Sequence, residues 1–188
     1  LRAWPGPPHV EVIVEPEPLG SAATIVNNRA FVAGAESFWI LYADNLTDAP
    51  LRRMADVHAR HDGLMTIGLF HAPKPSAAGI VQLDPDGRIV EFEEKPAHPR
   101  GDLANAGIYL ARAGLFDAMP PSPGTPFDFG FHVLPRLVGR ARTQRAYRLY
   151  ALATTPPKPG LIRSDGGEAI ELEVWELGER EFGTFVAG

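Results

Sequence analysis

The hydrophobic pattern of the first 70 residues alternates between short, largely unbroken apolar runs and segments with helical periodicity. The apolar runs lie at residues 10–14, 38–43 and 64–70. Unbroken runs of this length are typical of strands that are buried on both faces in a parallel sheet. The sequence predicts one helix at about residues 22–31 and a second that begins near Asp48 and ends at Gly63. The order β-α-β-α-β therefore predicts an α/β fold whose sheet carries helices on both faces.

A hairpin follows this alternating region. Two strand-like runs, at 79–83 and 88–94, flank Asp84-Pro85-Asp86-Gly87, in which proline presets φ and glycine permits a positive φ. Beyond the hairpin we expect a strand at 105–110, a short helix at 113–119, and a helix at 127–138 with a kink at Pro135.

The pattern changes again near residue 142, so we divide the chain into domains at 1–142 and 143–188. A strand is expected at 147–151 and a proline-dense turn at 154–160. Residues 168–175 alternate between acidic and apolar side chains, which predicts a strand with one solvent-exposed face. A terminal helix is expected at 179–187.

Composition narrows the class of protein. The chain has 188 residues, 45% of them hydrophobic and 22% charged, and a formal net charge of −5. This balance argues against a general nucleic-acid or membrane-surface binder. The absence of cysteine excludes disulfides and thiolate metal sites. We expect a soluble, cytoplasmic protein with no nucleic-acid or membrane partner. Because the chain begins with Leu1, apparently inside an element, we also expect part of its first domain to be missing.

Several common catalytic patterns are missing from the sequence. The six histidines lack zinc-site spacing, and there is no Walker A loop, Rossmann glycine fingerprint or glycine-flanked serine elbow. Polar clusters instead follow the predicted strands, where ligands bind in open α/β sheets. Taken singly, each polar cluster is more often a turn than a functional site. For Asp44, a role as the cap of a loop is about as good an explanation as a role in a site. The clusters are Glu17-Pro18-Leu19-Gly20-Ser21-Ala22, Asp44-Asn45, Glu93-Glu94-Lys95-Pro96 and Asn105-Ala106-Gly107.

In this order, the clusters resemble the motifs of the sugar-phosphate nucleotidylyltransferases, over residues 9 to about 140. Phe127-Asp128-Phe129-Gly130 is similar to a motif of the mannose-1-phosphate guanylyltransferase branch. The resemblance implies an incomplete Rossmann-like nucleotidyltransferase sheet. It also implies the reaction of a nucleoside triphosphate with a sugar-1-phosphate, which gives a nucleotide sugar, as in GDP-mannose synthesis, and pyrophosphate. The sugar phosphate is itself the nucleophile, so positioning and charge neutralisation would dominate catalysis.

The resemblance also implies residue roles. Asp44 would be the catalytic metal ligand and would hold Mg²⁺, the implied cofactor, against the α-phosphate. Lys95 would pair with the sugar phosphate, and Glu94 would accept hydrogen bonds from sugar hydroxyls. The loop that contains Gly20 would lie close to the nucleotide base. In full, the implied substrate-binding residues are Leu19, Gly20, Ser21, Ala22, Asn45, Glu94, Lys95, Asn105 and Gly107.

Two departures from the family pattern reduce the activity that we expect. The glycine-rich triphosphate loop would precede Leu1, and residues 147–156 contain no aspartate where the second metal ligand should lie. We therefore expect an impaired or inactive enzyme, with a non-catalytic nucleotide or sugar-phosphate binding remnant as the alternative. A sheet without its first strand would leave open edges. The segment 147–188, a second copy of the chain in a homo-oligomer, or missing sequence would cover them, and the strand 168–175 could serve as the cover.

The C-terminal region resembles a different family. Pro156-Pro157-Lys158-Pro159-Gly160-Leu161 and Phe182-Gly183-Thr184-Phe185-Val186 are similar to segments of the C-terminal domain of allophanate hydrolases. This resemblance covers about residues 146–188, a small β-rich segment. It adds a further alternative, an accessory segment of an allophanate hydrolase.

Overall fold

The computed structural model describes residues 10–43, 45, 47, 49–143, 149–153, 158–163 and 169–174. Its main sheet has six strands, which run in the spatial order β4-β3-β5-β2-β6, with β1 also paired to β5. These strands are β1 (Ser37–Leu41), β2 (Met65–His71), β3 (Gly79–Leu83), β4 (Ile89–Glu94), β5 (Leu103–Arg112) and β6 (Leu149–Ala153).

The long strand β5 organises this sheet. Along one edge it pairs antiparallel with β2. Its other edge pairs with β3 near the start, where Ala104 lies opposite Ile80, and with β1 further along. Strand β2 also pairs with β6, and this pairing is parallel. Ten residues long, β5 thus joins strands that lie far apart in the sequence.

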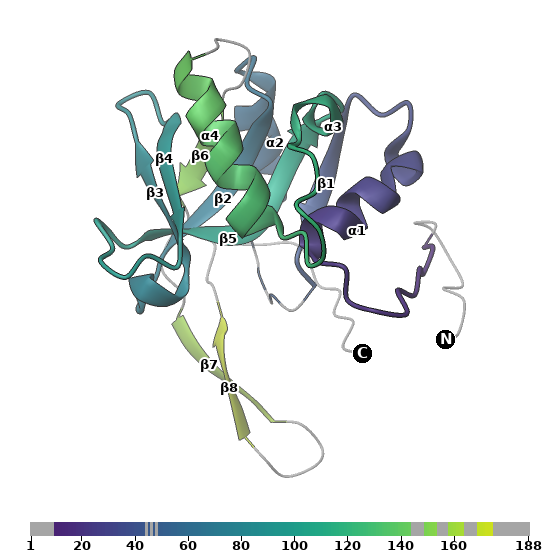
Figure 1. Ribbon diagram of the computed structural model, residues 1–188. Coiled ribbons are helices and arrows are strands. Elements are labelled where there is room, and N and C mark those ends of the chain that lie inside the picture. Colours follow the sequence, from purple (N-terminus) through teal and green to yellow (C-terminus); the bar gives the residue numbers. More distant parts are fainter. Residues whose placement is uncertain are drawn as a thin grey trace.

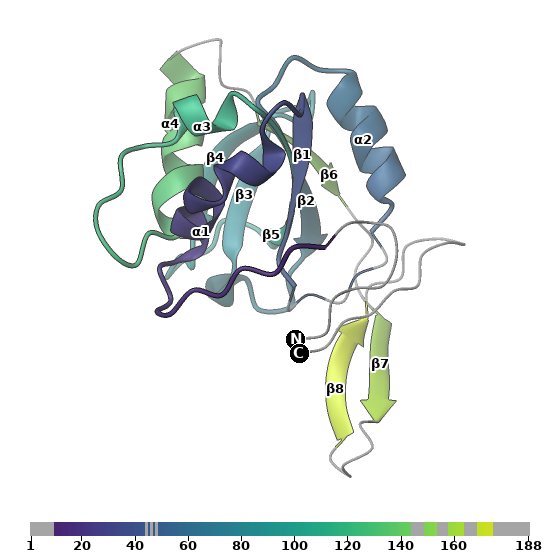
Figure 2. The same cartoon turned by 90° about the vertical axis from the view of Figure 1, so that its right-hand side faces the viewer.

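Helices cover both faces of the sheet, so the predicted α/β class is confirmed. Figures 1 and 2 show α2 (Leu51–Ala59) on one face, and α1 (Ser21–Asn27), α3 (Leu115–Ala118) and α4 (Leu134–Thr143) on the other. Short turns complete the fold: η1 (Arg29–Val32), η2 (Pro75–Ala77) and the π-type turn η3 (Phe129–Val133). No helix in the described ranges has the length and apolar character needed to cross a membrane.

The prediction that the first strands pair with one another in a parallel sheet is wrong. Strands β1 and β2 are not neighbours, because β5 lies between them and runs antiparallel to both. An unbroken apolar run reports burial on two faces and carries no information on the direction of the neighbouring strand. The run at 65–69 is buried throughout, as predicted. Strand β1 is only partly buried, and Leu41 at its end is 50% exposed.

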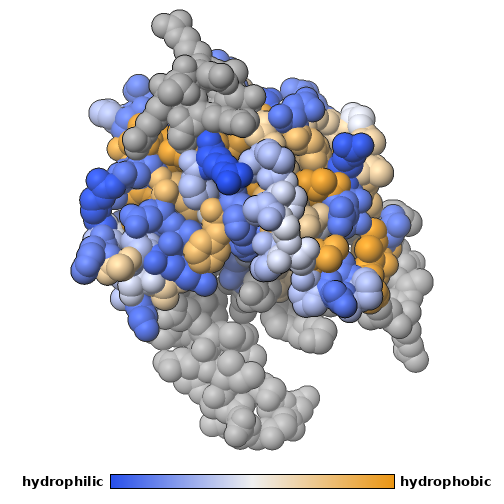
Figure 3. Space-filling view, in the orientation of Figure 1, coloured by the Kyte–Doolittle hydropathy of each residue, from blue (hydrophilic) through white to orange (hydrophobic). Residues whose placement is uncertain are grey.

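The predicted strand at 10–14 is also wrong. Residues 10–15 have no regular secondary structure, and Val12 and Val14 are 57% and 74% exposed. A strand pattern forms a strand only where another strand pairs with it, and none of the described strands pairs with this segment. In Figure 3, apolar surface appears on the right, the side on which Figure 1 places α1 and the segment before it.

Other elements follow the sequence more closely. The hairpin forms as predicted, and Gly87 in its turn has a φ of 77°. Helix α2 begins at Leu51 after Pro50 rather than at the expected cap Asp48, which lies outside the described residues. The single helix expected at 127–138 is instead η3 followed by α4. Pro135 is the second residue of α4, directly after η3.

The C-terminal strands form a sheet of their own. Strands β7 (Lys158–Arg163) and β8 (Ala169–Val174) pair antiparallel with each other and not with the main sheet. Residues 168–175 therefore do not cover an open edge of the main sheet, whereas β6, which lies within the same predicted segment 147–188, does pair with β2 of that sheet. The region expected as a turn at 154–160 already includes the start of β7. The helix predicted at 179–187 lies outside the described residues.

A chain of hydrogen bonds fixes the end of α2 to the sheet. Gly63 N donates to His61 Nδ1 at 2.9 Å, so His61 carries its proton on Nε2 and donates it to Thr66 Oγ1 at 2.8 Å. The Thr66 hydroxyl then donates to His58 Nδ1 at 2.8 Å, and His58 Nε2 faces Ser37 Oγ at 3.3 Å. The bond from Gly63 N requires an unprotonated Nδ1 on His61, and in this arrangement both histidines are neutral.

Burial and the nearby Arg112 favour the neutral form of the two histidines. Arg112 donates to the backbone carbonyls of His58 and His61 at 3.0 and 2.8 Å. The pKa of His58 is lowered from 6.5 to about 4, chiefly by burial and then by the Arg112 charge, while Glu36 acts in the opposite direction. Burial, His58 and Arg112 likewise lower the pKa of His61 to about 4.

We expect the free energy of unfolding to rise with pH between about 4 and 6.5. The folded-state pKa values lie below 6.5, so the unfolded state binds more protons in this window. The stabilisation is complete above pH 6.5 and is lost as the pH falls to 4, on the order of 1 kcal/mol per pH unit for His58. Urea unfolding at several pH values measures this slope. His58→Gln should reduce it, and the exposed control His98→Gln should not. Equal slopes in both variants would contradict the account.

Candidate functional site

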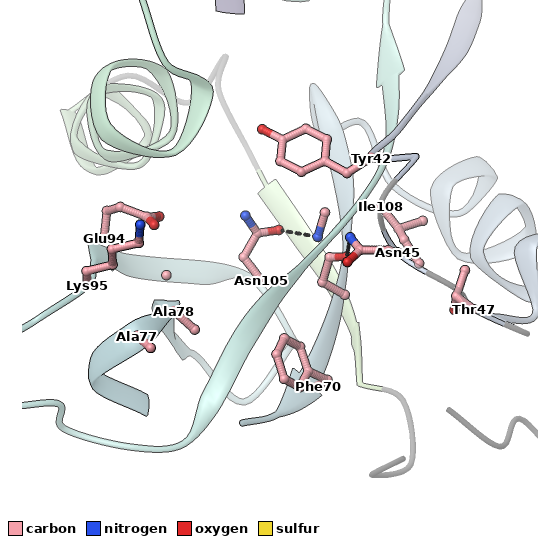
Figure 4. Close-up of a pocket in the computed structure, with 13 residues that line it drawn as sticks. Tyr42, Asn45, Thr47, Phe70, Ala77, Ala78, Glu94, Lys95, Asn105 and Ile108 are labelled. Atoms are coloured by element: carbon pink, nitrogen blue, oxygen red, sulfur yellow. Dashed lines mark hydrogen bonds between the residues drawn. The ribbon is translucent and has the colours of Figure 1, made fainter. Parts of the chain in front are cut away.

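A pocket of about 410 Å³ opens where the ends of several strands meet. Figure 4 shows Glu94 and Lys95 on one side, Asn45 and Thr47 on the other, and Asn105 between them. The pocket contains five of the nine predicted substrate-binding residues: Asn45, Glu94, Lys95, Asn105 and Gly107. Its remaining lining comes from Tyr42, Thr47, Phe70, Ala77, Ala78, Gly79, Ala106 and Ile108.

The Asn105–Gly107 corner is held by a compact set of hydrogen bonds. Asn105 Oδ1 accepts from Gly107 N at 3.1 Å, and Asn105 Nδ2 donates to the Tyr109 hydroxyl at 2.7 Å. Gly107 has a φ of 69°, and a Cβ there would lie 2.7 Å from Asn45 Nδ2 and 3.1 Å from Tyr42 Cδ2. Glycine suits this position for two reasons: the backbone φ is positive, and neighbouring side chains leave little room for a Cβ. The corner is rigid before any ligand arrives.

Glu94 lies between two glycines. A Cβ on Gly79 or on Gly130 would lie 2.6 Å from Glu94 Oε2, so a side chain at either position would displace the Glu94 carboxyl group. Burial raises the pKa of the Glu94 carboxyl, the nearby Asp128 carboxylate raises it further, and Lys95 lowers it. No hydrogen bond within the described part of the chain reaches the Glu94 carboxyl oxygens. They are therefore available to accept from hydroxyl groups of a ligand.

Lys95 follows Glu94 in a backbone conformation that is uncommon for a residue with a side chain. Its φ is 47°, and its N–H donates to Ala78 O at 3.1 Å. Residues in such regions cost about 1–3 kcal/mol and cluster at functional sites. The ammonium lies over the Phe131 ring, 5.6 Å from its centroid. The geometry presents one cation at the pocket, beside one carboxylate.

The predicted Leu19–Ala22 group does not line this pocket. It packs instead on the segment before η3: Phe127 N donates to Leu19 O at 2.9 Å, and Ala22 N donates to Phe127 O at 2.9 Å. Gly20 has a φ of 94°, and a Cβ there would lie 2.6 Å from Phe127 O. This contact requires glycine at position 20 whether or not a nucleotide base lies nearby. The structure thus separates the predicted residues into a pocket group and a loop group.

Ser21 and Asp128 connect the two groups. Ser21 Oγ donates to Asp128 Oδ2 at 3.1 Å and accepts from Phe129 N at 2.9 Å. The other carboxylate oxygen of Asp128 accepts from Phe131 N at 2.9 Å. Asp128 therefore has partners for both oxygens, and its charge acts on Glu94 in the pocket.

Comparison with known proteins places this site in a family. Residues 3–151 match the family model described as Nucleotidyl transferase, and residues 130–188 match that of the Allophanate hydrolase C-terminal domain. The first match covers well over half of the chain. The chain belongs to the nucleotidyl transferase family.

Individual relatives agree with this assignment. The glucose-1-phosphate adenylyltransferase of Clostridium acetobutylicum is 34% identical over 139 residues, which cover 69% of this chain and 36% of that protein. Mannose-1-phosphate guanylyltransferase 1 of Arabidopsis thaliana is 32% identical over 112 residues, 58% of this chain and 31% of that protein. The chain thus spans about a third of the length of these relatives.

The predicted metal ligand of this nucleotidyl transferase, Asp44, lies outside the described residues. The next residue, Asn45, lines the pocket. Within the described part of the chain, no three His, Cys, Asp or Glu side chains come together as a metal-binding group.

Sequence reasoning missed several residues of the site. Tyr42 lines the pocket, and burial raises the pKa of its phenol. Gly79, Asp128 and Gly130 shape the surroundings of Glu94. Asp128 and Gly130 could have been found, because they belong to the motif Phe127-Asp128-Phe129-Gly130. No sequence motif marks Gly79 or Tyr42, since their importance comes from contacts with residues far away in the sequence.

We expect Gly20→Ala to lower the free energy of unfolding by about 1–3 kcal/mol, the range for a side chain forced into a conformation reserved for glycine. The contact with Phe127 should add to this cost, because the obstructing atoms are backbone. Gly34→Ala is the matched control: Gly34 has a φ of 84°, but a Cβ there meets nothing within 4 Å. Chemical unfolding should show the larger loss for Gly20→Ala. A smaller loss than in the control would contradict the close contact.

Proposed function

We propose that the pocket binds a sugar-1-phosphate and that the chain carries the sugar-phosphate side of a nucleotidylyltransferase site. The reaction is that of a nucleoside triphosphate with a sugar-1-phosphate to give a nucleotide sugar and pyrophosphate. One observation carries the proposal: Glu94, Lys95, Asn105 and Gly107, far apart in sequence, line one pocket of about 410 Å³. The names of the two relatives, a glucose-1-phosphate adenylyltransferase and a mannose-1-phosphate guanylyltransferase, support the substrate class.

The chemistry of the lining suits this ligand. The Lys95 ammonium is a point charge for the phosphate, and the Glu94 carboxylate accepts from sugar hydroxyls. Asn105 and the Gly107 backbone form a fixed wall, because their hydrogen bonds are already made within the protein. The sugar phosphate supplies the attacking oxygen, so these residues bind and orient it and need not remove a proton. Mg²⁺ held by Asp44 would neutralise charge on the α-phosphate.

Binding without turnover is the second candidate. It is favoured by residues 147–156, which contain no aspartate to serve as a second metal ligand. Pyrophosphate release from GTP with mannose-1-phosphate, and from ATP with glucose-1-phosphate, separates the two candidates. Release in either mixture establishes turnover and identifies the base and sugar. Calorimetric binding of the sugar phosphate without release establishes the second candidate.

An accessory role in allophanate hydrolysis is a third candidate, and the match of residues 130–188 to the Allophanate hydrolase C-terminal domain favours it. The sequence contains no glycine-flanked serine elbow that could supply a nucleophile for this reaction. Calorimetric titration with allophanate tests it directly. Binding of allophanate but of neither sugar phosphate would replace the proposal above.

Lys95→Met should weaken binding of a sugar-1-phosphate about tenfold or more, because it removes the cation that faces the phosphate. Glu94→Gln keeps the shape of the side chain and removes its charge, so we expect a smaller loss that also extends to the free sugar. Isothermal titration with glucose-1-phosphate and mannose-1-phosphate measures both effects. Lys74→Met, on another exposed lysine, is the control. Unchanged affinity in Lys95→Met would contradict the assignment of the phosphate to this pocket.

Asp44→Ala should abolish Mg²⁺-dependent binding of the nucleotide and leave binding of the sugar phosphate nearly unchanged. The reason is that a carboxylate together with substrate phosphates is the usual Mg²⁺ ligand set. Titration with GTP and ATP, with and without Mg²⁺, measures the change. Asp56→Ala, on the exposed side of α2, is the matched control. Equal nucleotide binding before and after the Asp44 substitution would show that this assignment is wrong.

A further inference from the structure

Phe131 is an exposed aromatic residue with no place in the hydrophobic core. Its side chain is 51% exposed, whereas Phe129, two residues earlier in η3, is fully buried and lies against the Tyr109 ring at 5.2 Å. Phe131 is also not among the residues that line the pocket. Neither core packing nor direct lining of the pocket therefore accounts for its position.

The position of Phe131 is nevertheless well defined. Asp128 Oδ1 accepts a hydrogen bond from Phe131 N at 2.9 Å, and Asp128 Oδ2 accepts one from Ser21. Because Phe129 on one side of the turn is buried, the turn cannot rotate without moving the core. The Phe131 ring thus projects from a turn that is anchored on both sides.

Two neighbouring residues of this turn contact two neighbouring residues of the pocket. Gly130 leaves room for the Glu94 carboxylate, since a Cβ there would lie 2.6 Å from Oε2. Phe131 places its ring under the Lys95 ammonium, at 5.6 Å. The described residues offer Lys95 no ion pair in competition with this contact.

A lysine side chain has four rotatable bonds, so its ammonium samples a large volume unless something holds it. A ring face within about 6 Å attracts a cation through its quadrupole. The φ of 47° at Lys95 fixes the origin of the side chain, and the ring fixes its end. Together they reduce the conformational freedom that the lysine loses when it meets a phosphate.

We propose that Phe131 is a positioning residue, whose ring holds the Lys95 ammonium where the phosphate of a sugar-1-phosphate arrives; this rests on the sugar-phosphate function proposed above. Phe131 acts through Lys95 and does not itself touch the ligand. Its contribution therefore concerns the phosphate and not the sugar ring.

The contact can be tested without any ligand. The chain has three lysines, Lys74, Lys95 and Lys158, so the lysine side-chain signals are simple to assign by NMR with Lys95→Met. In the free protein, the ε-methylene protons of Lys95 should show an upfield ring-current shift that is lost in Phe131→Leu. Phe31→Leu is the matched control, because Phe31 is also exposed, at 61%, and lies in η1. No ring-current shift in the wild type would overturn the inference.

Binding then tests the role of the contact. Phe131→Leu should weaken binding of mannose-1-phosphate or glucose-1-phosphate about two- to fivefold, as expected for one exposed cation–π contact, and leave binding of free mannose unchanged. Phe131→Trp should restore or improve it. In Lys95→Met, the further change Phe131→Leu should have no effect, since the cation it positions is gone.

The outcomes distinguish this inference from the function on which it rests. Suppose that the wild type binds a sugar-1-phosphate, that Lys95→Met abolishes this binding, and that Phe131→Leu leaves it unchanged. The positioning role is then overturned, and the proposed function stands. Losses that multiply in the double variant overturn the role in the same way. If the wild type binds neither sugar-1-phosphate, the proposed function fails and the positioning role fails with it.

Discussion

The site depends on one close approach between two backbone segments. Phe127 occupies the space that a side chain at position 20 would need, and two hydrogen bonds join the segments on either side of Gly20. This contact lies directly before Asp128, the residue that caps η3. From there Asp128 reaches Ser21 and the N–H of Phe131, and Gly130 lies against Glu94. Residues outside the pocket therefore shape the space around the pocket carboxyl group.

The same arrangement gives the site its electrostatic character. Asp128 accepts a hydrogen bond at each carboxylate oxygen, and its charge acts on the half-buried Glu94, whose pKa is raised by burial first and by Asp128 second. Lys95 opposes that shift and is the cation that the pocket presents. A carboxylate and an ammonium on adjacent residues suit a ligand that carries hydroxyl groups and a phosphate. The long strand β5 supplies the opposite wall through Asn105 and Gly107, which are fixed by hydrogen bonds within the protein.

The sequence was informative where local patterns determine the structure. The hairpin, α2 and the buried strand β2 could be predicted because turn residues and apolar spacing act over a few positions. Strand pairing could not, because β5 pairs with β1, β2 and β3 through contacts that no short segment encodes. Resemblance to a family identified Glu94, Lys95, Asn105 and Gly107, which the pocket brings together. It could not separate them from the Leu19–Ala22 loop, nor identify Gly79, which matters only because Glu94 lies against it.

The central claim is that Glu94, Lys95, Asn105 and Gly107 form one sugar-phosphate pocket. Amide chemical-shift mapping of the ¹⁵N-labelled chain during titration with mannose-1-phosphate, and separately with glucose-1-phosphate, tests it most directly. The account predicts that the largest saturable shifts belong to the amides of residues 94–95 and 105–107, with small shifts along α2. Saturable shifts confined to another surface, or none with either sugar phosphate, would contradict it.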